Sequence, residues 1–177
     1  MQNPPGPYSS LYYLNRVARG SDYSEHVGLI MAGSISPPSR TVEISTDGGV
    51  SFQNLTDIPW GEPTEPETAG PCVVILDEDT AFIAGGADGV STNRTSHCDT
   101  YLLDLNTKQW TQGPNMTHCR FWHSCSLITN ATSGEREVVI VGGTDQQREN
   151  RCQYIKEVEI VNLDTMQVRN GETNMNC

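Results

Sequence analysis

Short runs of apolar, β-favouring residues recur along this chain, separated by polar turns. The clearest run, Ala81–Ala84, is followed directly by the glycine pair Gly85-Gly86. Another run, Val138–Val141, leads in the same way into Gly143, which is 57 residues after Gly86. No segment of useful length has the apolar periodicity of a helix, so the pattern predicts strands joined by turns.

The similarity extends beyond the glycines. Leu105 and Leu163 are 58 residues apart, and so are Trp110 and Val168. A near-constant offset over a whole unit indicates that one supersecondary block is repeated. Repeats of roughly 40–50 residues are typical of propeller blades.

Each repeat is expected to contribute four strands. The first repeat is expected at Leu11–Leu14, His26–Met31, Thr41–Ser45 and Val50–Phe52. The second is expected at Cys72–Leu76, Thr80–Ala84, Thr100–Leu105 and Gln109–Gln112. The third is expected at His123–Thr129, Glu137–Val141, Val158–Leu163 and Gln167–Arg169. The chain then divides into an irregular segment (1–25) with a possible inner strand, a degenerate blade (26–58) and two clear blades (70–116 and 120–175).

The second repeat resembles a kelch repeat. Its glycine pair is followed by Tyr101, Trp110 and a Pro-x-Met ending at Met116, and the next repeat opens with Arg120-x-x-His123. The third repeat has Val168 in place of the tryptophan. The resemblance implies an all-β fold, a kelch-type β-propeller fragment of about three four-stranded blades that binds other proteins, and some relatives are enzymes. Because propellers typically close with 4–8 blades, further blades of the same polypeptide are expected.

An Asp-box-like segment, S-x-D-x-G-x-S/T-W/F, lies in the first repeat at Ser45–Phe52. Its aspartate and glycines suit a turn between the third and fourth strands of a blade. This segment therefore supports a propeller rather than catalysis. Tyr101, Trp110 and Trp122 are expected to pack within the blades, with Trp110 largely buried.

Charge and hydropathy narrow the possible partners. The formal net charge of −11 disfavours nucleic acid, whose backbone needs clustered Lys and Arg. No stretch of 18 apolar residues is present, so no membrane span is expected. Residues 1–25 show no apolar signal-peptide core.

Cysteine recurs with the blade. Corresponding positions hold Cys72 and Cys125, Cys98 and Cys152, and Cys119 and Cys177. This recurrence favours a disulfide scaffold over buried free thiols, and hence a secreted or extracellular protein. Cys98 is expected to pair with Cys119 or Cys125, with Cys119 favoured, and Cys152 with Cys177 one blade later. Four glycosylation sequons, at Asn54, Asn93, Asn115 and Asn130, agree with this location.

No catalytic residue, metal site or cofactor is expected. His97 and His118 flank Cys98 and Cys119, but adjacent pairs are not the usual spacing of zinc ligands. His123, beside aromatic residues, fits a packed strand histidine better than a ligand or base.

The resulting hypothesis is a non-catalytic, extracellular protein-binding module with an unidentified protein partner. Propeller topology places the loops 87–99 and 144–157 on one face with the links 59–71 and 113–122. Loops on a rigid scaffold commonly carry contacts. The expected contact residues there are Asp88, Arg94, His97, Asp145, Arg148 and Arg151. Two alternatives stay open: part of a propeller enzyme of the galactose-oxidase or sialidase type, and a cytosolic kelch substrate adaptor.

Overall fold

The computed structural model describes residues 10–14, 28–35, 38–45, 50–60, 68–77, 79–88, 95–145 and 154–171. Side chains are described from Arg40 onward, apart from those of Thr68 and Ala69. Among the described residues, no helix is long and apolar enough to cross a membrane.

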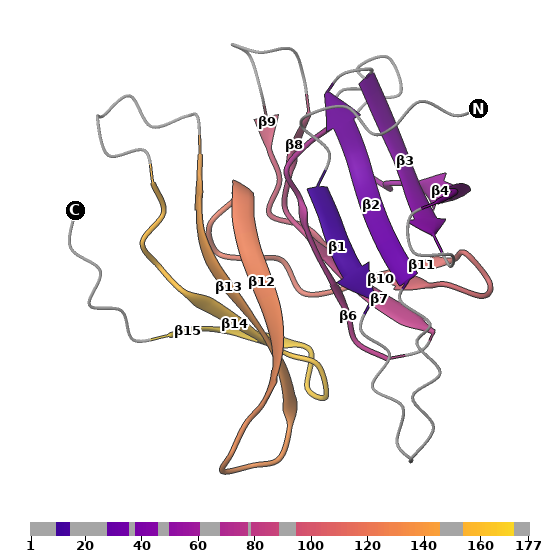
Figure 1. Ribbon diagram of the computed structural model, residues 1–177. Helices are drawn as coiled ribbons and strands as arrows, with labels where there is room; N and C mark the ends of the chain where they lie inside the picture. The colour runs from indigo at the N-terminus through magenta and orange to yellow at the C-terminus, as the bar shows by residue number, and fades with distance from the viewer. Residues whose placement is uncertain are drawn as a thin grey trace.

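Three four-stranded antiparallel sheets form three blades (Figure 1). The first blade comprises β1 (Ser10–Leu14), β2 (Gly28–Ile35), β3 (Pro38–Ser45) and β4 (Gln53–Asp57). The second comprises β6 (Cys72–Ile75), β7 (Thr80–Ala84), β10 (Thr100–Asp104) and β11 (Trp110–Gln112). The third comprises β12 (Phe121–Thr129), β13 (Arg136–Thr144), β14 (Glu159–Asn162) and β15 (Gln167–Asn170). In each blade the strands pair in chain order, as the sequence predicts for a meander.

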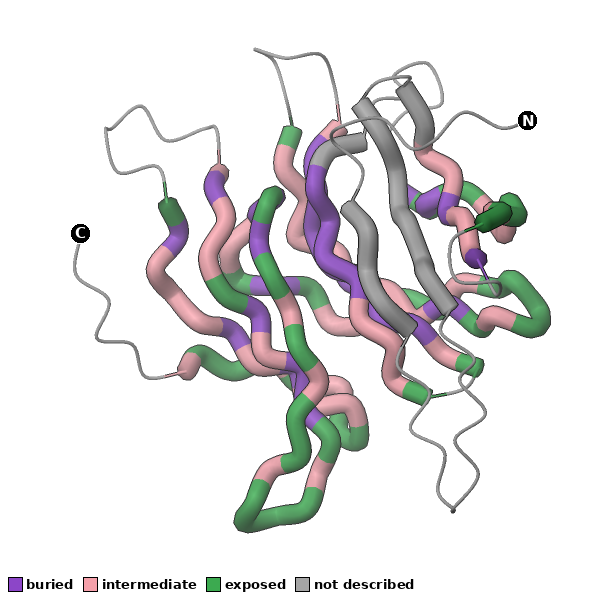
Figure 2. Tube along the Cα trace, in the orientation of Figure 1, coloured by how far each residue is buried: buried purple, intermediate pink, exposed green. Residues whose placement is uncertain are grey.

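The blades stack side by side with their first strands innermost. Strand β6 lies against both β1 and β12. One apolar core fills each junction between blades, and Figure 2 shows buried positions along the strands of the second and third blades. Val42 packs with Ile83 and Leu103 between the first two blades. Phe82 packs with Ile140 between the second and third. Alternating side chains of each central strand thus serve two neighbouring cores.

The last turn of the second blade is repeated in the third. The Asp104 carboxylate accepts hydrogen bonds from the backbone N–H groups of Asn106 and Thr107, at 2.9 and 2.7 Å. The Asn162 side-chain oxygen, 58 positions later, likewise accepts hydrogen bonds from the backbone N–H groups of Asp164 and Thr165, at 2.9 and 2.8 Å. Lys108 and Met166 both adopt left-handed backbone angles, with φ of 61° and 53°. Equal turns at an equal offset confirm the repeat.

The first blade departs most from the sequence predictions. Its fourth strand was expected at Val50–Phe52, and the structure places it at Gln53–Asp57. Register shifts interrupt β3 between Val42 and Glu43, and β2 around Gly33. A bulge of this kind shifts the pairing of every residue that follows it in the strand, and no simple sequence pattern marks its position. Part of the Asp-box-like segment, residues 46–49, lies outside the described residues.

Trp110 is half-buried, not largely buried as expected. It stands on the outer strand of the second blade, where its ring meets Tyr101 edge-on at 6.0 Å. Its indole N–H donates a 2.9 Å hydrogen bond to the Asp57 carbonyl oxygen in the first blade. Its position at the outer edge explains both the partial exposure and this bond between blades.

Candidate functional site: the loop face

A small sheet that the sequence did not predict links the loops and the connections between blades. Strands β5 (Thr68–Ala69), β8 (Ala87–Asp88) and β9 (Thr95–Ser96) pair in the order β5-β8-β9. This pairing brings residues 68–69 of the link beside residues 87–88 of the loop, which pair in turn with residues 95–96. We call the side formed by the described residues 59–60, 68–71, 87–88, 95–99, 113–122, 144–145 and 154–157 the loop face. We call the side formed by the turn residues 77, 79, 106–109, 130–135 and 164–166 the hairpin face.

Three of the expected contact residues lie in the described part of the loop face. His97 Nε2 is 3.3 Å from an Asp88 carboxylate oxygen, and its Nδ1 is 3.7 Å from Asp99. The Ser96 hydroxyl donates a 2.9 Å bond to Asp145, which joins the second blade to the third. The Asp88 and His97 side chains are only 13% and 15% exposed, so they chiefly hold the face together. Arg94, Arg148 and Arg151 lie outside the described residues.

Two disulfides cross-link the second and third blades and the segments between them. One joins Cys98 to Cys119, the favoured partner, and thereby ties the 87–99 loop to the next link. The other joins Cys72 on β6 to Cys125 on β12, a pair that the sequence reasoning did not propose. These two cysteines lie on the innermost strands of consecutive blades, and that shared position could have revealed the pairing. Cys152 and Cys177 lie outside the described residues.

A zinc site of the four clustered His and Cys residues does not form. Cys98 and Cys119 are bonded to each other, and His97 faces Asp88 and Asp99. His118 lies 3.7 Å from Glu159 in the third blade. The two histidines therefore face separate carboxylates.

Arg120 anchors the link to the third blade from a fully buried position. Its guanidinium pairs with the buried Glu159 carboxylate at 2.5 Å. It also donates bonds to the carbonyl oxygens of Gly142 and Glu157, at 3.0 and 3.1 Å. Burial lowers the pKa of Arg120, and the Glu159 charge opposes that shift. Glu159 also accepts a 2.5 Å bond from the Thr117 backbone N–H, so the link has many points of attachment.

His123 is a packed core histidine, as the sequence favoured. Its side chain lies between two blades, and a Cβ added at Gly85 would come within 2.7 Å of its ring. Burial, together with the nearby Arg120 charge, lowers the pKa of His123 to about 3. The imidazole is therefore neutral at physiological pH and contributes to packing.

Trp122 is exposed, contrary to the expectation that it packs within a blade. Its side chain is 54% exposed at the loop-face end of β12, and its φ of 55° is rare for a bulky residue. Its backbone N–H donates a 2.9 Å bond to the Gly70 carbonyl oxygen. A Cβ at Gly70 would lie 2.2 Å from the indole, and the Phe121 ring packs at 4.7 Å. The indole is thus held rigidly while part of it faces solvent.

Tyr154 is a second exposed aromatic residue at the same end of the third blade. It is 71% exposed and pairs across from Thr144, which in turn pairs with Phe121. Adjacent strands lie about 5 Å apart, so Tyr154 is about two strand spacings from Phe121. The sequence reasoning missed both rings. The alternation Trp122-x-Ser124-x-Ser126 was the available sign that Trp122 shares a side with exposed polar residues.

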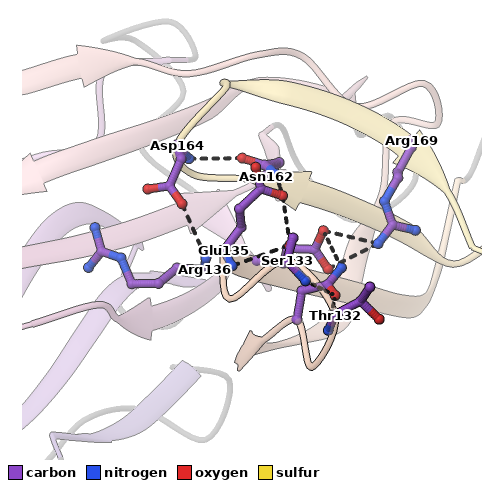
Figure 3. Close-up of polar contacts among 9 residues, drawn as sticks. Thr132, Ser133, Glu135, Arg136, Asn162, Asp164 and Arg169 are labelled. Carbon is purple, nitrogen blue, oxygen red and sulfur yellow. Dashed lines mark hydrogen bonds and ion pairs between the residues drawn. The ribbon is translucent and has the colours of Figure 1, made fainter.

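The hairpin face combines contacts within single turns with contacts between neighbouring turns (Figure 3). In the 130–135 insertion, the Asn130 side-chain oxygen accepts bonds from Thr132 and Ser133 at 2.9 and 3.2 Å. The Glu135 carboxylate accepts a 3.0 Å bond from the Asn162 side chain. This leaves the half-buried Asn130 engaged in its own turn, whereas the sequon residues Asn54 and Asn115 are exposed. Asn93 lies outside the described residues.

Comparison with known proteins identifies the fold. No family model and no curated protein matches the chain. A solved fungal alcohol oxidase of the AA5 family, in complex with copper, is similar with a TM-score of 0.61 and 17% identity over 84% of this chain. The structure of YjhT is similar with a TM-score of 0.56 and 13% identity over 82%. This chain has the kelch-propeller fold. The matches span 30% and 42% of those two proteins.

The oxidase similarity raises the question of copper. Among the residues that the structure describes, no group of three or more His, Cys, Asp or Glu side chains is arranged to hold a metal ion. No step of the function proposed below involves copper.

Proposed function

We propose that this chain is part of an extracellular, non-catalytic kelch propeller that binds another protein through its loop face. The observation that carries the proposal is Trp122, an exposed indole held in a strained backbone conformation. Strained residues that persist in a well-packed setting often mark functional sites. Tryptophan and tyrosine are also enriched among the residues that dominate the energy of protein interfaces.

The rigidity of Trp122 supports a binding role. Gly70 and Phe121 pack against it, so little side-chain freedom is left to lose when a partner docks. Ordering a mobile side chain at an interface costs about 0.5–1.5 kcal/mol, which this arrangement avoids. The exposed Tyr154 is a second aromatic residue at the same end of the blade.

An extracellular location is supported by the two disulfides, which indicate an oxidising environment. The exposed sequons Asn54 and Asn115 agree with secretion. A glycan on Asn115 would stand on the 113–122 link and shield one rim of the loop face. A cytosolic adaptor would instead keep these cysteines reduced.

The proposal is tested by placing the photo-crosslinker benzoylphenylalanine at Tyr154 in the secreted protein. Thr111, exposed on β11 away from the loop face, is the matched control position. We expect a partner to be crosslinked from position 154 and not from 111. With that partner purified, Trp122→Ala should weaken binding by about 30-fold or more, the effect of losing a hot-spot residue. Crosslinking from both positions alike, or unchanged binding by Trp122→Ala, would remove the loop face as the binding surface.

The enzyme alternative rests on the similarity to the copper-containing alcohol oxidase. The enzyme alternative is distinguished from the binding module by incubating the protein with Cu(II) and primary alcohols and measuring the hydrogen peroxide released. The binding-module proposal expects no peroxide above that of a heat-denatured sample. Copper-dependent release of peroxide would contradict the binding-module proposal and support an oxidase.

A further inference from the structure

The two disulfides lie in different surroundings. Cys72 is fully buried in the apolar core between the second and third blades, and Cys125 packs against that core. Cys98 and Cys119 are both half-buried and lie in segments of the loop face. Because a thiol must reach a sulfur atom to open a disulfide, access favours attack on the Cys98–Cys119 bond.

The leaving groups of the two disulfides differ in the same direction. Attack on Cys125, the more accessible sulfur of the inter-blade disulfide, would expel the Cys72 thiolate into an apolar core. Apolar surroundings raise the pKa of a thiol, and a thiol of higher pKa leaves more slowly. Attack on Cys98 or Cys119 instead expels a thiolate that water can reach, because both residues are partly exposed. The loop-face disulfide is therefore the one that a reductant opens first.

The 113–122 link is attached to both neighbouring blades, and reduction would weaken only one attachment. On the side of the third blade, the Thr117 backbone N–H stays bonded to the Glu159 carboxylate. On the side of the second blade, the covalent bond is lost. The bonds that remain there include that from the Met116 N–H to the Cys98 carbonyl oxygen, at 2.8 Å. The inter-blade disulfide stays closed, so the two blades remain joined.

Trp122 is the residue whose geometry would respond to this loosening. Its left-handed φ of 55° is strained, and such strain persists only where the surroundings hold a residue from several sides. Trp122 lies three positions after Cys119, and its backbone N–H bonds across the loop face to Gly70. Opening the Cys98–Cys119 bond removes one of these restraints. The backbone at Trp122 can then relax, and the indole loses its fixed orientation.

We propose that the Cys98–Cys119 disulfide is a redox switch that controls binding at the loop face. A thiolate of a dithiol reductant attacks one sulfur, and the other sulfur leaves as a thiolate and takes up a proton. The second thiol of the reductant then resolves the mixed disulfide. Two electrons and two protons pass from the reductant, which becomes a disulfide, to the protein, which gains two thiols. This control rests on the loop-face function proposed above: the oxidised chain holds Trp122 ready for a partner, and the reduced chain does not.

The order of opening is tested by treating the secreted protein with increasing dithiothreitol, alkylating the free thiols and mapping them by peptide mass spectrometry. We expect Cys98 and Cys119 to be fully alkylated at a concentration that leaves Cys72 and Cys125 closed. The far-ultraviolet circular dichroism spectrum should be unchanged at that concentration. Simultaneous opening of the two disulfides, or earlier opening of the inter-blade disulfide, would overturn the proposal.

The response of Trp122 is tested in protein labelled with 5-fluorotryptophan. After selective reduction, the fluorine signal of Trp122, assigned with Trp122→Phe, should move to the position it has in the unfolded chain. The signal of Trp110, on the outer strand of the second blade, is the control and should stay in place. The double variant Cys98→Ser, Cys119→Ser should show the reduced spectrum without dithiothreitol. A Trp122 signal that neither reduction nor the double variant moves would overturn the proposal.

Control of binding is tested with the benzoylphenylalanine crosslinker at Tyr154. Crosslinking by the selectively reduced and alkylated protein should fall to the level of the Thr111 control position. Equal crosslinking by the oxidised and reduced proteins would remove the switch and leave the loop-face function standing. Absence of crosslinking from the oxidised protein as well would overturn both the loop-face function and its control.

Discussion

The loop face and the hairpin face of the same blades are held by different kinds of interaction. On the hairpin face, Asp104 and Asn162 bond to residues two and three positions later. On the loop face, partners are far apart in sequence: the Ser96–Asp145 bond spans 49 positions and the Arg120–Glu159 pair spans 39. The same short-range turn recurs in the second and third blades. Long-range contacts differ from blade to blade, which leaves the loop face free to specialise.

The largest loss of folding stability should follow from breaking the buried Arg120–Glu159 ion pair of the loop face. Arg120→Ala leaves the Glu159 carboxylate buried without its counter-charge and also removes the bonds to Gly142 and Glu157. Breaking a buried pair typically costs about 3–5 kcal/mol. Urea denaturation followed by tryptophan fluorescence measures the loss.

Arg136→Ala is the matched control on the other side of the molecule. Arg136 and Asp77 form an exposed pair at 3.5 Å, with both side chains about half exposed. Exposed pairs contribute about 0–1 kcal/mol. Similar losses for the two arginine variants would contradict the contrast between the buried pair of the loop face and the exposed pair of the hairpin face.

Removing the Cys98–Cys119 disulfide should have the next largest effect. The double variant Cys98→Ser, Cys119→Ser frees a loop with a sequence separation of 21 residues. Such cross-links typically stabilise by about 2–4 kcal/mol, largely through the unfolded chain. The shift in urea midpoint at constant slope gives the value, and a shift below about 0.5 kcal/mol would show that the backbone bonds alone hold the loop face.

His123 should make stability depend on pH. Its pKa is about 3 in the folded protein and 6.5 ordinarily, so the unfolded chain binds the proton first as pH falls. Stability is then lost as pH falls from 6.5 toward 3, at up to about 1.4 kcal/mol per pH unit. His123→Leu should remove this part of the slope, as seen by comparing urea midpoints of the two proteins between pH 7 and 5. Equal slopes would mean that His123 is hydrated or protonated in the fold.

The smallest effect should come from a single hairpin turn. Asp104→Ala removes the acceptor for two backbone N–H groups in an exposed turn, and the loss of stability should be small because water can replace that acceptor. The equivalent Asn162→Ala should cost a similar amount plus the bond to Glu135. Thermal unfolding of both variants checks this, and a loss above about 3 kcal/mol would show that the turns are not local units.

Local pattern accounts for most of what the sequence predicts correctly. The second-blade strands were expected within one or two residues of β6, β7, β10 and β11, because alternating apolar residues and polar turns are encoded nearby. The predicted position of β4 was wrong, and the small β5-β8-β9 sheet was not predicted at all. Both depend on partners distant in sequence, which local patterns of residues do not reveal. Trp122 was misassigned for a different reason: its alternation with the exposed Ser124 and Ser126 was a local sign of exposure that the prediction overlooked.

Residue-resolved hydrogen exchange before and after disulfide reduction tests the contrast between the two faces most directly. The backbone N–H groups of Gly86, Met116 and Trp122 all bond across the loop face. They should lose protection once the disulfides are reduced. Those of Lys108 and Leu163, near the hairpin turns, should keep the protection they have in the oxidised protein. Uniform loss of protection at both faces would contradict the account, because it would mean that the two faces open as one unit.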